Sequence, residues 1–244
     1  YGIIFSRLSW LLKMIEVIDL RKSFNGQEIL RGINLKVNSG QSLALIGGSG
    51  SGKSVLLKHI IGLLKPDSGK ILIENEDIGK LRGRKLKRLK ERFGMVFQGG
   101  ALFDSLTVFE NVAFPLREKT KLKALQIRKK VCEELAEVGL SGTENKYPAE
   151  ISGGMKKRVA LARCLVMSPE IILFDEPTTG LDPLTGKAIH TMIRSCQKSH
   201  EFTSIMVTHE IPDIFSMVDR VAMLYNRTIH AEGTPEEIQN SKDP

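Results

Sequence analysis

The feature that most constrains this chain is a glycine-rich segment that fits the phosphate-loop pattern G-x-x-x-x-G-K-[ST] at every fixed position. It consists of Gly47, Gly48, Ser49, Gly50, Ser51, Gly52, Lys53 and Ser54. The apolar residues 42–46 before it predict a buried strand, and residues 55–64 after it have the apolar content of a packed helix. This context argues against the alternative, a glycine-rich turn that only happens to precede a lysine.

A strand, a glycine loop and a helix N-terminus together form a cradle for anions. Successive backbone N–H groups point inward, and the helix dipole adds partial positive charge. Glycines allow the backbone to approach phosphate oxygens where a Cβ atom would obstruct it. We therefore predict that Lys53 binds the β- and γ-phosphates of a nucleotide and that the Ser54 hydroxyl binds Mg²⁺.

Composition and charge limit the classes of function. Of 244 residues, 41% are hydrophobic and 26% charged, and the formal net charge is +8. No apolar run approaches the about 18–20 residues of a membrane span. Residues 82–92 carry part of the positive charge, and they either face phosphates of lipid or nucleic acid or form a basic surface helix with Leu86 and Leu89 turned inward. No aromatic residues interleave, which favours the surface helix.

The cysteines and the N-terminal segment carry no motif. Cys132, Cys164 and Cys196 lack metal-ligand spacing and are typical of small buried residues in a reducing compartment. Residues 1–13 lack the features of a secretory signal and precede a methionine at which a strand pattern begins. We interpret them as a leader or non-native extension, with a short interfacial helix as the alternative.

Periodicity predicts an α/β fold with an inserted helical part. Strand patterns at 15–20 and 29–37, joined by an Asn25-Gly26 hairpin turn, predict a small antiparallel sheet ahead of the phosphate loop. Helical spacing prevails from residue 99 to about 167. Further elements are expected in a fixed order: a helix at 127–138, apolar strands at 171–174 and 204–208, and helices at 185–199, 211–217 and after Thr234.

Two further clusters suggest phosphate chemistry. Asp175 and Glu176 follow an apolar strand, where one carboxylate can hold Mg²⁺ and the other can orient or deprotonate water; a solvated strand end is the alternative. The run Ser152-Gly153-Gly154-Met155 precedes an apolar helix, so Ser152 can cap that helix and the glycines expose its first N–H groups. This run is either a second anion site or only a helix cap.

Taken together and in this order, the motifs resemble the nucleotide-binding subunit of an ATP-binding-cassette (ABC) transporter from residue 15 to the end. The phosphate loop with Val55 resembles the Walker A motif, and residues 171–176 resemble Walker B. The resemblance implies ATP and Mg²⁺ as ligands and the following roles: Phe24 stacks on adenine, unless it is a core residue; Ser54, Gln98 and Asp175 hold Mg²⁺; Glu176 is the catalytic base; His209 contacts the γ-phosphate; and Asp182 lies at a dimer interface.

The resemblance also implies how copies assemble. In the family two subunits pair head to tail, and each ATP lies between Walker A of one copy and the signature of the other, here Ser152, Gly153, Gly154 and Met155. The expected fold is a P-loop NTPase core (residues 14–98 and 168–244) with an N-terminal antiparallel β subdomain and an inserted helical subdomain (residues 99–167).

A narrower resemblance concerns residues 98–117 and Met155, which look like those of the Mla and Mce lipid-transport ATPases. It implies phospholipid transport between two membranes, at the cytoplasmic face of the inner membrane. The implied partners are a membrane permease and an Mce-domain protein, and a small regulatory protein is a further candidate; nucleic acid is not expected.

The sequence departs from the family pattern in two places. Met155 stands where the family usually has glutamine, so Ser152 and backbone N–H groups must carry more of the contact to the second copy. A further C-terminal tail, expected in the lipid-transport subfamily, does not follow Pro244. A generic solute importer and a non-transport ABC ATPase are the alternative functions.

Overall fold

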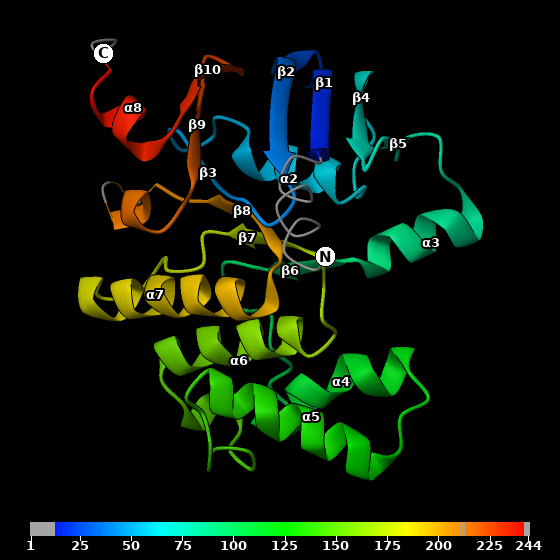
Figure 1. Cartoon of the computed structure of the whole chain (residues 1–244), viewed down its shortest axis with the longest axis vertical. Coiled ribbons are helices and arrows are strands. Elements are labelled where there is room, and N and C mark those ends of the chain that lie inside the picture. The colour runs from blue at the N-terminus through cyan, green and yellow to red at the C-terminus, as the bar shows by residue number, and fades with distance from the viewer. Residues whose placement is uncertain (1–12, 210, 212, 242–244) are drawn as a thin grey trace, which may run out of the picture. The chain divides into compact units, whose positions relative to one another are not determined.

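The structure is a computed structural model that describes residues 13–209, 211 and 213–241 (Figure 1). The expected leader at residues 1–13 therefore lies outside the described residues except for its last position. The chain forms two compact units, which we describe separately. Unit 1 contains the described residues up to Phe93 and from Phe202 onward, and unit 2 runs from Gly94 to Glu201.

Unit 1 contains a four-stranded antiparallel sheet in the order β2-β1-β4-β5 (Figure 1). Its strands are β1 (Lys13–Phe24), β2 (Gln27–Asn38), β4 (Ser68–Ile73) and β5 (Glu76–Asp77). The β1–β2 connection consists of Asn25 and Gly26, both left-handed with φ of 51° and 78°. These angles suit a two-residue type I′ turn and confirm the predicted hairpin.

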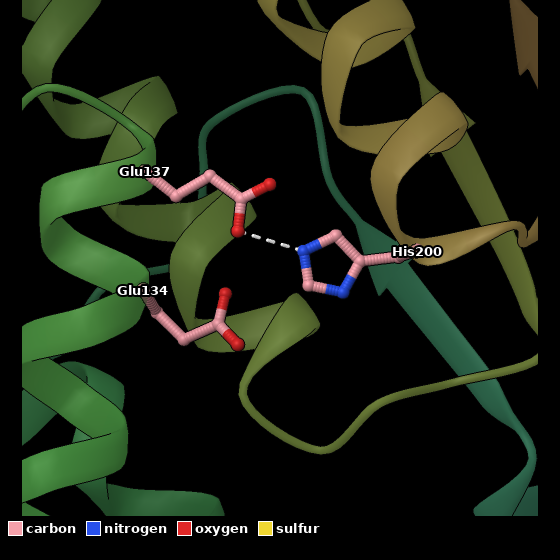
Figure 2. A group of neighbouring side chains, drawn as sticks. All are labelled: Glu134, Glu137 and His200. Atoms are coloured by element: carbon pink, nitrogen blue, oxygen red, sulfur yellow. Dashed lines mark hydrogen bonds and ion pairs between the residues drawn. The ribbon is translucent and has the colours of Figure 1, made fainter.

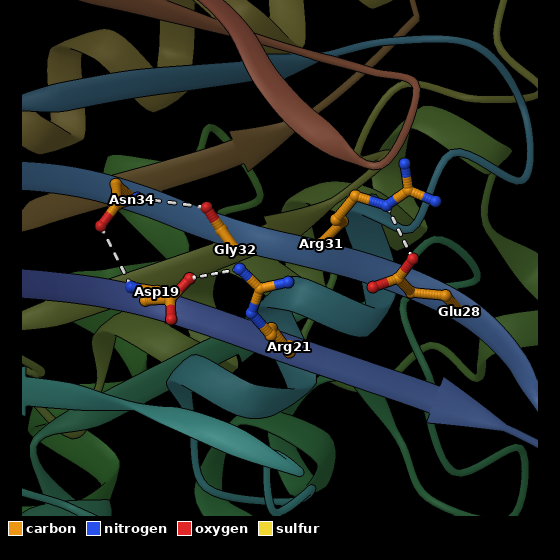
Figure 3. A network of polar contacts seen from close by, with 6 residues as sticks. All are labelled: Asp19, Arg21, Glu28, Arg31, Gly32 and Asn34. Carbon is orange, nitrogen blue, oxygen red and sulfur yellow. Dashed lines mark hydrogen bonds and ion pairs between the residues drawn. The ribbon is translucent and has the colours of Figure 1, made fainter.

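An irregularity in this hairpin is stabilised by polar contacts. The register of β1 on β2 shifts between Val17 and Leu20, where Asp19 has a φ of 43°. The Asn34 side chain accepts a hydrogen bond from the Asp19 N–H and donates one to the Gly32 carbonyl, as Figure 3 shows. Gly32 is required here, because a Cβ atom would lie 2.8 Å from the Asp19 Oδ1 atom. The bulge strengthens the local twist of the sheet.

The second sheet of unit 1 supports the phosphate loop. Its strands β3 (Ser42–Ile46), β8 (Thr203–Val207), β9 (Arg220–Tyr225) and β10 (Thr228–Gly233) lie in the order β10-β9-β3-β8. β3 is parallel to both neighbours and all five of its residues are buried, as expected for a central strand. Asp219 fixes the start of this strand by accepting hydrogen bonds from the Ser42 N–H and hydroxyl, each 2.8 Å long.

The helices of unit 1 are short. They are α2 (Lys53–Ile60), α3 (Gly83–Glu91), the 3₁₀ turn η2 (Asp213–Ser216) and α8 (Pro235–Gln239). Of the helix expected at 211–217, the structure contains only the 3₁₀ turn, and residues 210 and 212 lie outside the described part of the chain. On α3, Leu89 is buried and Leu86 half-buried beneath exposed basic side chains, as the surface-helix interpretation expects.

Unit 2 is mainly helical. It contains β6 (Phe93–Val96, from its second residue), α4 (Val108–Lys119), α5 (Ala124–Glu137), the 3₁₀ turn η1 (Pro148–Glu150), α6 (Gly153–Leu165), β7 (Ile171–Asp175) and α7 (Pro183–His200). α6 packs against α4, α5 and α7, and the buried β7 neighbours β6 (Figure 1). The predicted helices at 127–138 and 185–199 are confirmed, each extended by a few residues.

Two findings agree with the composition. Within the described residues, no helix combines the length and apolarity needed to cross a membrane. All three cysteines are free thiols. Burial raises the pKa of Cys164 and of Cys196 to about 12, so both are protonated near neutral pH and chemically quiet.

Candidate functional site

The phosphate loop joins the end of β3 to the start of α2. Gly50 and Gly52 have φ of 73° and 105°, conformations that side chains other than glycine rarely adopt. Gly52 is the N-cap of α2, and no acidic residue lies in the first turn of that helix. Lys53 is only 6% exposed, and its Nζ atom donates hydrogen bonds to the carbonyls of Gly47 (2.7 Å) and Gly48 (2.8 Å). A positive charge is thus held at the loop, where the helix dipole already favours anions.

The space around the loop fits a polyphosphate. Ideal Cβ atoms at Gly48 and Gly50 would meet nothing within 4 Å, so these positions border open space. A Cβ atom at Gly47 would lie 2.4 Å from the Leu224 carbonyl oxygen, which shows how closely the loop packs on β9. The buried Ser51 Oγ atom has no hydrogen-bond partner in the protein. A phosphate oxygen would satisfy such a group, because buried polar atoms normally find partners.

Unit 1 also places His209 and Phe24. β3 and β8 run parallel, and the Thr208 N–H bonds to the Leu45 carbonyl, so exposed His209 follows β8 at the same sheet edge as the phosphate loop. Ligands bind at this carboxyl edge of parallel sheets. Phe24, at the end of β1, is 41% exposed with the Lys22 Nζ atom 5.2 Å from its ring centroid. The alternative that Phe24 is a core residue is therefore wrong.

Unit 2 brings Gln98 and Glu176 into contact. The Gln98 Nε2 atom donates a hydrogen bond of 3.2 Å to the Glu176 Oε2 atom, which also accepts one of 3.0 Å from the Thr179 hydroxyl. Glu176 has a φ of 50°, an uncommon angle for a residue with a side chain. Asp175 is the half-buried last residue of β7. Thr179 was not among the predicted site residues, although it lies only three positions beyond Glu176.

The signature residues and Asp182 also lie side by side. The Ser152 hydroxyl caps α6 by accepting a 3.2 Å hydrogen bond from the Met155 N–H. Asp182 caps α7 in the same way through the Thr185 N–H, and its hydrogen bonds from Thr185 hold the pKa of its carboxyl below the usual value. A Cβ atom at Gly154 would lie 2.8 Å from the Thr185 Cγ2 atom, so glycine permits this close packing.

Asn111 is a second residue that sequence analysis did not single out. It is fully buried on α4 and satisfies only backbone groups. Its Nδ2 atom donates to the carbonyls of Phe103, Leu106 and Thr107, and its Oδ1 atom accepts from the Phe103 N–H. A buried polar side chain in an otherwise apolar helix was the available sequence signal.

A separate acidic cluster joins α5 to α7 (Figure 2). It is the one group of described residues with metal-ligand proximity, and it consists of Glu134, Glu137 and His200. The His200 Nε2 atom pairs with the Glu137 Oε2 atom at 2.8 Å, and the Ser199 hydroxyl donates to the same carboxylate. With its imidazole committed to Glu137, the cluster acts as an ion pair between helices.

The predicted site residues therefore fall into two groups. Unit 1 holds the phosphate loop, His209 and Phe24, and unit 2 holds Gln98, the Asp175-Glu176 pair, the signature and Asp182. A glycine loop with a buried lysine between a parallel strand and a helix defines a phosphate-loop nucleotide-binding protein.

Comparison with known proteins narrows this class. Residues 30–179 match the model of the ABC transporter family, and the chain belongs to this family. It is 44% identical to the probable ribonucleotide transport ATP-binding protein mkl of Mycobacterium bovis, over 94% of this chain and 64% of that protein. It is 41% identical to the intermembrane phospholipid transport system ATP-binding protein MlaF of Haemophilus influenzae, over 94% of this chain and 87% of that protein.

Solved structures agree with this assignment. The cbiO1 protein of Clostridium perfringens, part of an ABC transporter complex, superimposes with a TM-score of 0.87 at 35% identity, covering 94% of this chain and 92% of that chain. A dimeric ATP-binding cassette bound to ADP and Pi gives a TM-score of 0.81 at 31% identity, covering 91% and 99%. The fold is thus that of an ABC ATPase, as predicted.

Proposed function

We propose that this protein is the ATP-hydrolysing subunit of an ABC transporter that moves phospholipid between two membranes. The observation that carries the lipid assignment is the 41% identity to the H. influenzae phospholipid-transport protein, which extends over 94% of this chain. The loop geometry supports nucleotide binding independently of any relative, because its open glycine positions and buried lysine suit a polyphosphate.

Each site residue has a role in this proposal. Lys53 and the loop N–H groups bind the phosphates of ATP, and Val55 belongs to the same segment. Glu176 accepts a proton from the attacking water, His209 contacts the γ-phosphate, and exposed Phe24 stacks on adenine. Mg²⁺, when bound, would neutralise phosphate charge; its ligands would be Ser54, Gln98 and Asp175, whose oxygen atoms suit a hard cation.

We propose that ATP holds two copies together. The phosphate loop of one copy and Ser152, Gly153 and Gly154 of the other would bind the same nucleotide. Exposed Ser152 heads α6, so its neighbours' N–H groups face outward for a second anion contact. Met155 offers no side-chain amide, and Asp182 would lie at the interface between copies. The similarity to a dimeric cassette bound to ADP and Pi supports this arrangement.

The proposed surroundings follow from the lipid assignment. The protein would lie at the cytoplasmic face of the inner membrane, bound to a permease near Gln98 and the helical residues 99–167. Phe97, Phe103 and Phe114 expose 41%, 44% and 39% of their surface in this region, and exposed phenyl rings commonly mark a protein interface. An Mce-domain protein and a small regulatory protein would complete the complex. We keep residues 14–98 with 168–244 as the proposed core.

Purification from the native membrane in mild detergent tests this function. Mass spectrometry of the co-purifying chains and lipids should identify a permease, an Mce-domain protein and bound phospholipid. A different permease without lipid would contradict the lipid assignment and leave the ATPase assignment intact. Recovery without any membrane protein would contradict transport altogether.

A further inference from the structure

The turn that follows Gln98 has an uncommon backbone shape. Gly100 and Ala101 are both left-handed, with φ of 72° and 47°. For alanine this conformation is unfavourable, so surrounding contacts must maintain it. The only backbone hydrogen bond printed within the turn runs from the Gly100 N–H to the Phe97 carbonyl, at 2.8 Å. The turn points its other carbonyl groups toward α6.

Two cationic side chains of α6 bind those carbonyl groups. The Arg163 guanidinium donates to Gly100 (2.7 Å, from Nη2) and to Ala101 (2.8 Å, from Nη1). Lys157, which is 8% exposed, donates from Nζ to the Gln98 carbonyl. Between them the turn rests on the helix backbone, because a Cβ atom at Gly100 would be 3.4 Å from the Ala160 Cβ atom.

The placement of Arg163 is costly for a surface ion. Burial lowers the pKa of its guanidinium, and its Cζ atom lies 6.0 Å from the Phe103 ring centroid. A buried guanidinium normally pairs with a carboxylate, whereas here the printed hydrogen-bond acceptors are two backbone carbonyls. Such a contact fixes the course of the backbone, since a planar fork constrains two carbonyls at once.

We propose that Lys157 and Arg163 are positioning residues that hold the turn after Gln98 against α6 and thereby keep the Gln98 carboxamide on Glu176. This inference rests on the proposed roles of Gln98 and Glu176 in ATP hydrolysis. The same helix begins at Ser152, so α6 joins the signature to the residue that contacts the catalytic base. Movement of either end is transmitted along one rigid element.

Arg163→Met tests the proposal, with Arg158→Met as the matched control. Arg158 lies on the same helix but donates to the Val138 carbonyl instead of the turn. We expect Arg163→Met to lower kcat about tenfold while KM for ATP changes less than about twofold, because a misplaced catalytic contact affects the chemical step more than binding. Arg163→Lys, which keeps a donor, should recover part of the loss.

A double-mutant cycle separates positioning from general stability. If Arg163 acts through Gln98, Arg163→Met should cause no further loss of kcat in a Gln98→Ala background. A loss in that background equal to the loss in the wild type would overturn the proposal, and so would wild-type kcat in Arg163→Met.

Hydrogen exchange makes failure of this inference distinguishable from failure of the proposed function. The Gly100 amide should exchange faster in Arg163→Met than in the wild type, and at the wild-type rate in Arg158→Met, whether or not the protein hydrolyses ATP. Unchanged exchange at Gly100 refutes the positioning role. A wild-type protein without ATPase activity refutes the proposed function but not the accelerated exchange.

Discussion

Gly47 and Gly48 are adjacent glycines with different structural reasons. Gly47 packs against backbone, since a Cβ atom there would lie 2.4 Å from the Leu224 carbonyl oxygen and 3.1 Å from the Ser51 Oγ atom. Gly48 borders open space. The motif in the sequence treats both as loop residues, but only Gly47 is required by the packing of the protein itself.

Gly47→Ala should therefore destabilise the protein, whereas Gly48→Ala should not. We expect Gly47→Ala to lower the free energy of unfolding by about 1–3 kcal/mol, the usual cost of overpacking against a backbone atom that cannot yield. Gly48→Ala should leave this free energy within about 0.5 kcal/mol of the wild type. Urea denaturation followed by circular dichroism measures both. Equal effects of the two substitutions would contradict the assigned packing.

At the scale of elements, the junction of α5 and α7 contains carboxyl groups in contrasting environments (Figure 2). Burial raises the pKa of Glu134, and its buried Oε2 atom has no hydrogen-bond partner. Burial also acts to raise the pKa of Glu137, but hydrogen bonds from Ser199 and His200 outweigh it and leave this pKa below the ordinary value. The cluster therefore favours one ionised carboxylate.

Glu134→Gln should stabilise the protein at neutral pH. Because the pKa of Glu134 is raised in the folded state, its contribution is fully present below the unfolded-state pKa and is lost as pH rises through the folded-state value. The amide does not ionise, so the difference in Tm from the wild type should be near zero in acid and grow to about 2–4 °C near pH 7, if the gain is ~1 kcal/mol. Thermal melts between these pH values measure it.

Glu133→Gln is the control for that experiment. Glu133 is exposed on the same helix and pairs only with Lys129 at 3.9 Å. Surface pairs of this kind contribute little, so its Tm should follow the wild type at every pH. A constant Tm difference between Glu134→Gln and the wild type across the pH range would refute the raised pKa.

Much of the fold could be predicted from the sequence at this scale. The Asn25-Gly26 turn, the apolar strands and the phosphate loop are local patterns, and local physics decides them. The extended helix expected at 211–217 failed because apolar spacing alone cannot distinguish one 3₁₀ turn from an α-helix. Contacts such as Arg163 with Gly100 join residues 63 positions apart, and no local pattern reveals which backbone carbonyl a distant side chain will bind.

At the scale of the whole molecule, Glu176 links chemistry to assembly in the proposed function. Its carboxylate accepts hydrogen bonds from Gln98 and Thr179, so it is held in place before any nucleotide binds. If Glu176 is the base for ATP hydrolysis, removing its charge should trap the nucleotide between two copies rather than prevent it from binding.

Glu176→Gln should retain ATP binding, lower turnover by at least about 10²-fold and accumulate as an ATP-bound dimer. Phosphate release measures turnover, and size-exclusion chromatography with light scattering measures the dimer with and without ATP. Exposed Glu133→Gln again serves as control and should remain as active as the wild type. Unchanged turnover in Glu176→Gln would remove this residue from its assigned role.

The contacts of Asn111 have a consequence for evolution. All of its partners are backbone groups, three carbonyls and one N–H, so it fixes the path of residues 103–107 without contacting their side chains through hydrogen bonds. Exposed members of this stretch, such as Phe103, can then be exchanged over generations while the backbone keeps its shape. A lineage can alter which protein its cassette recognises and leave the neighbouring catalytic residues undisturbed.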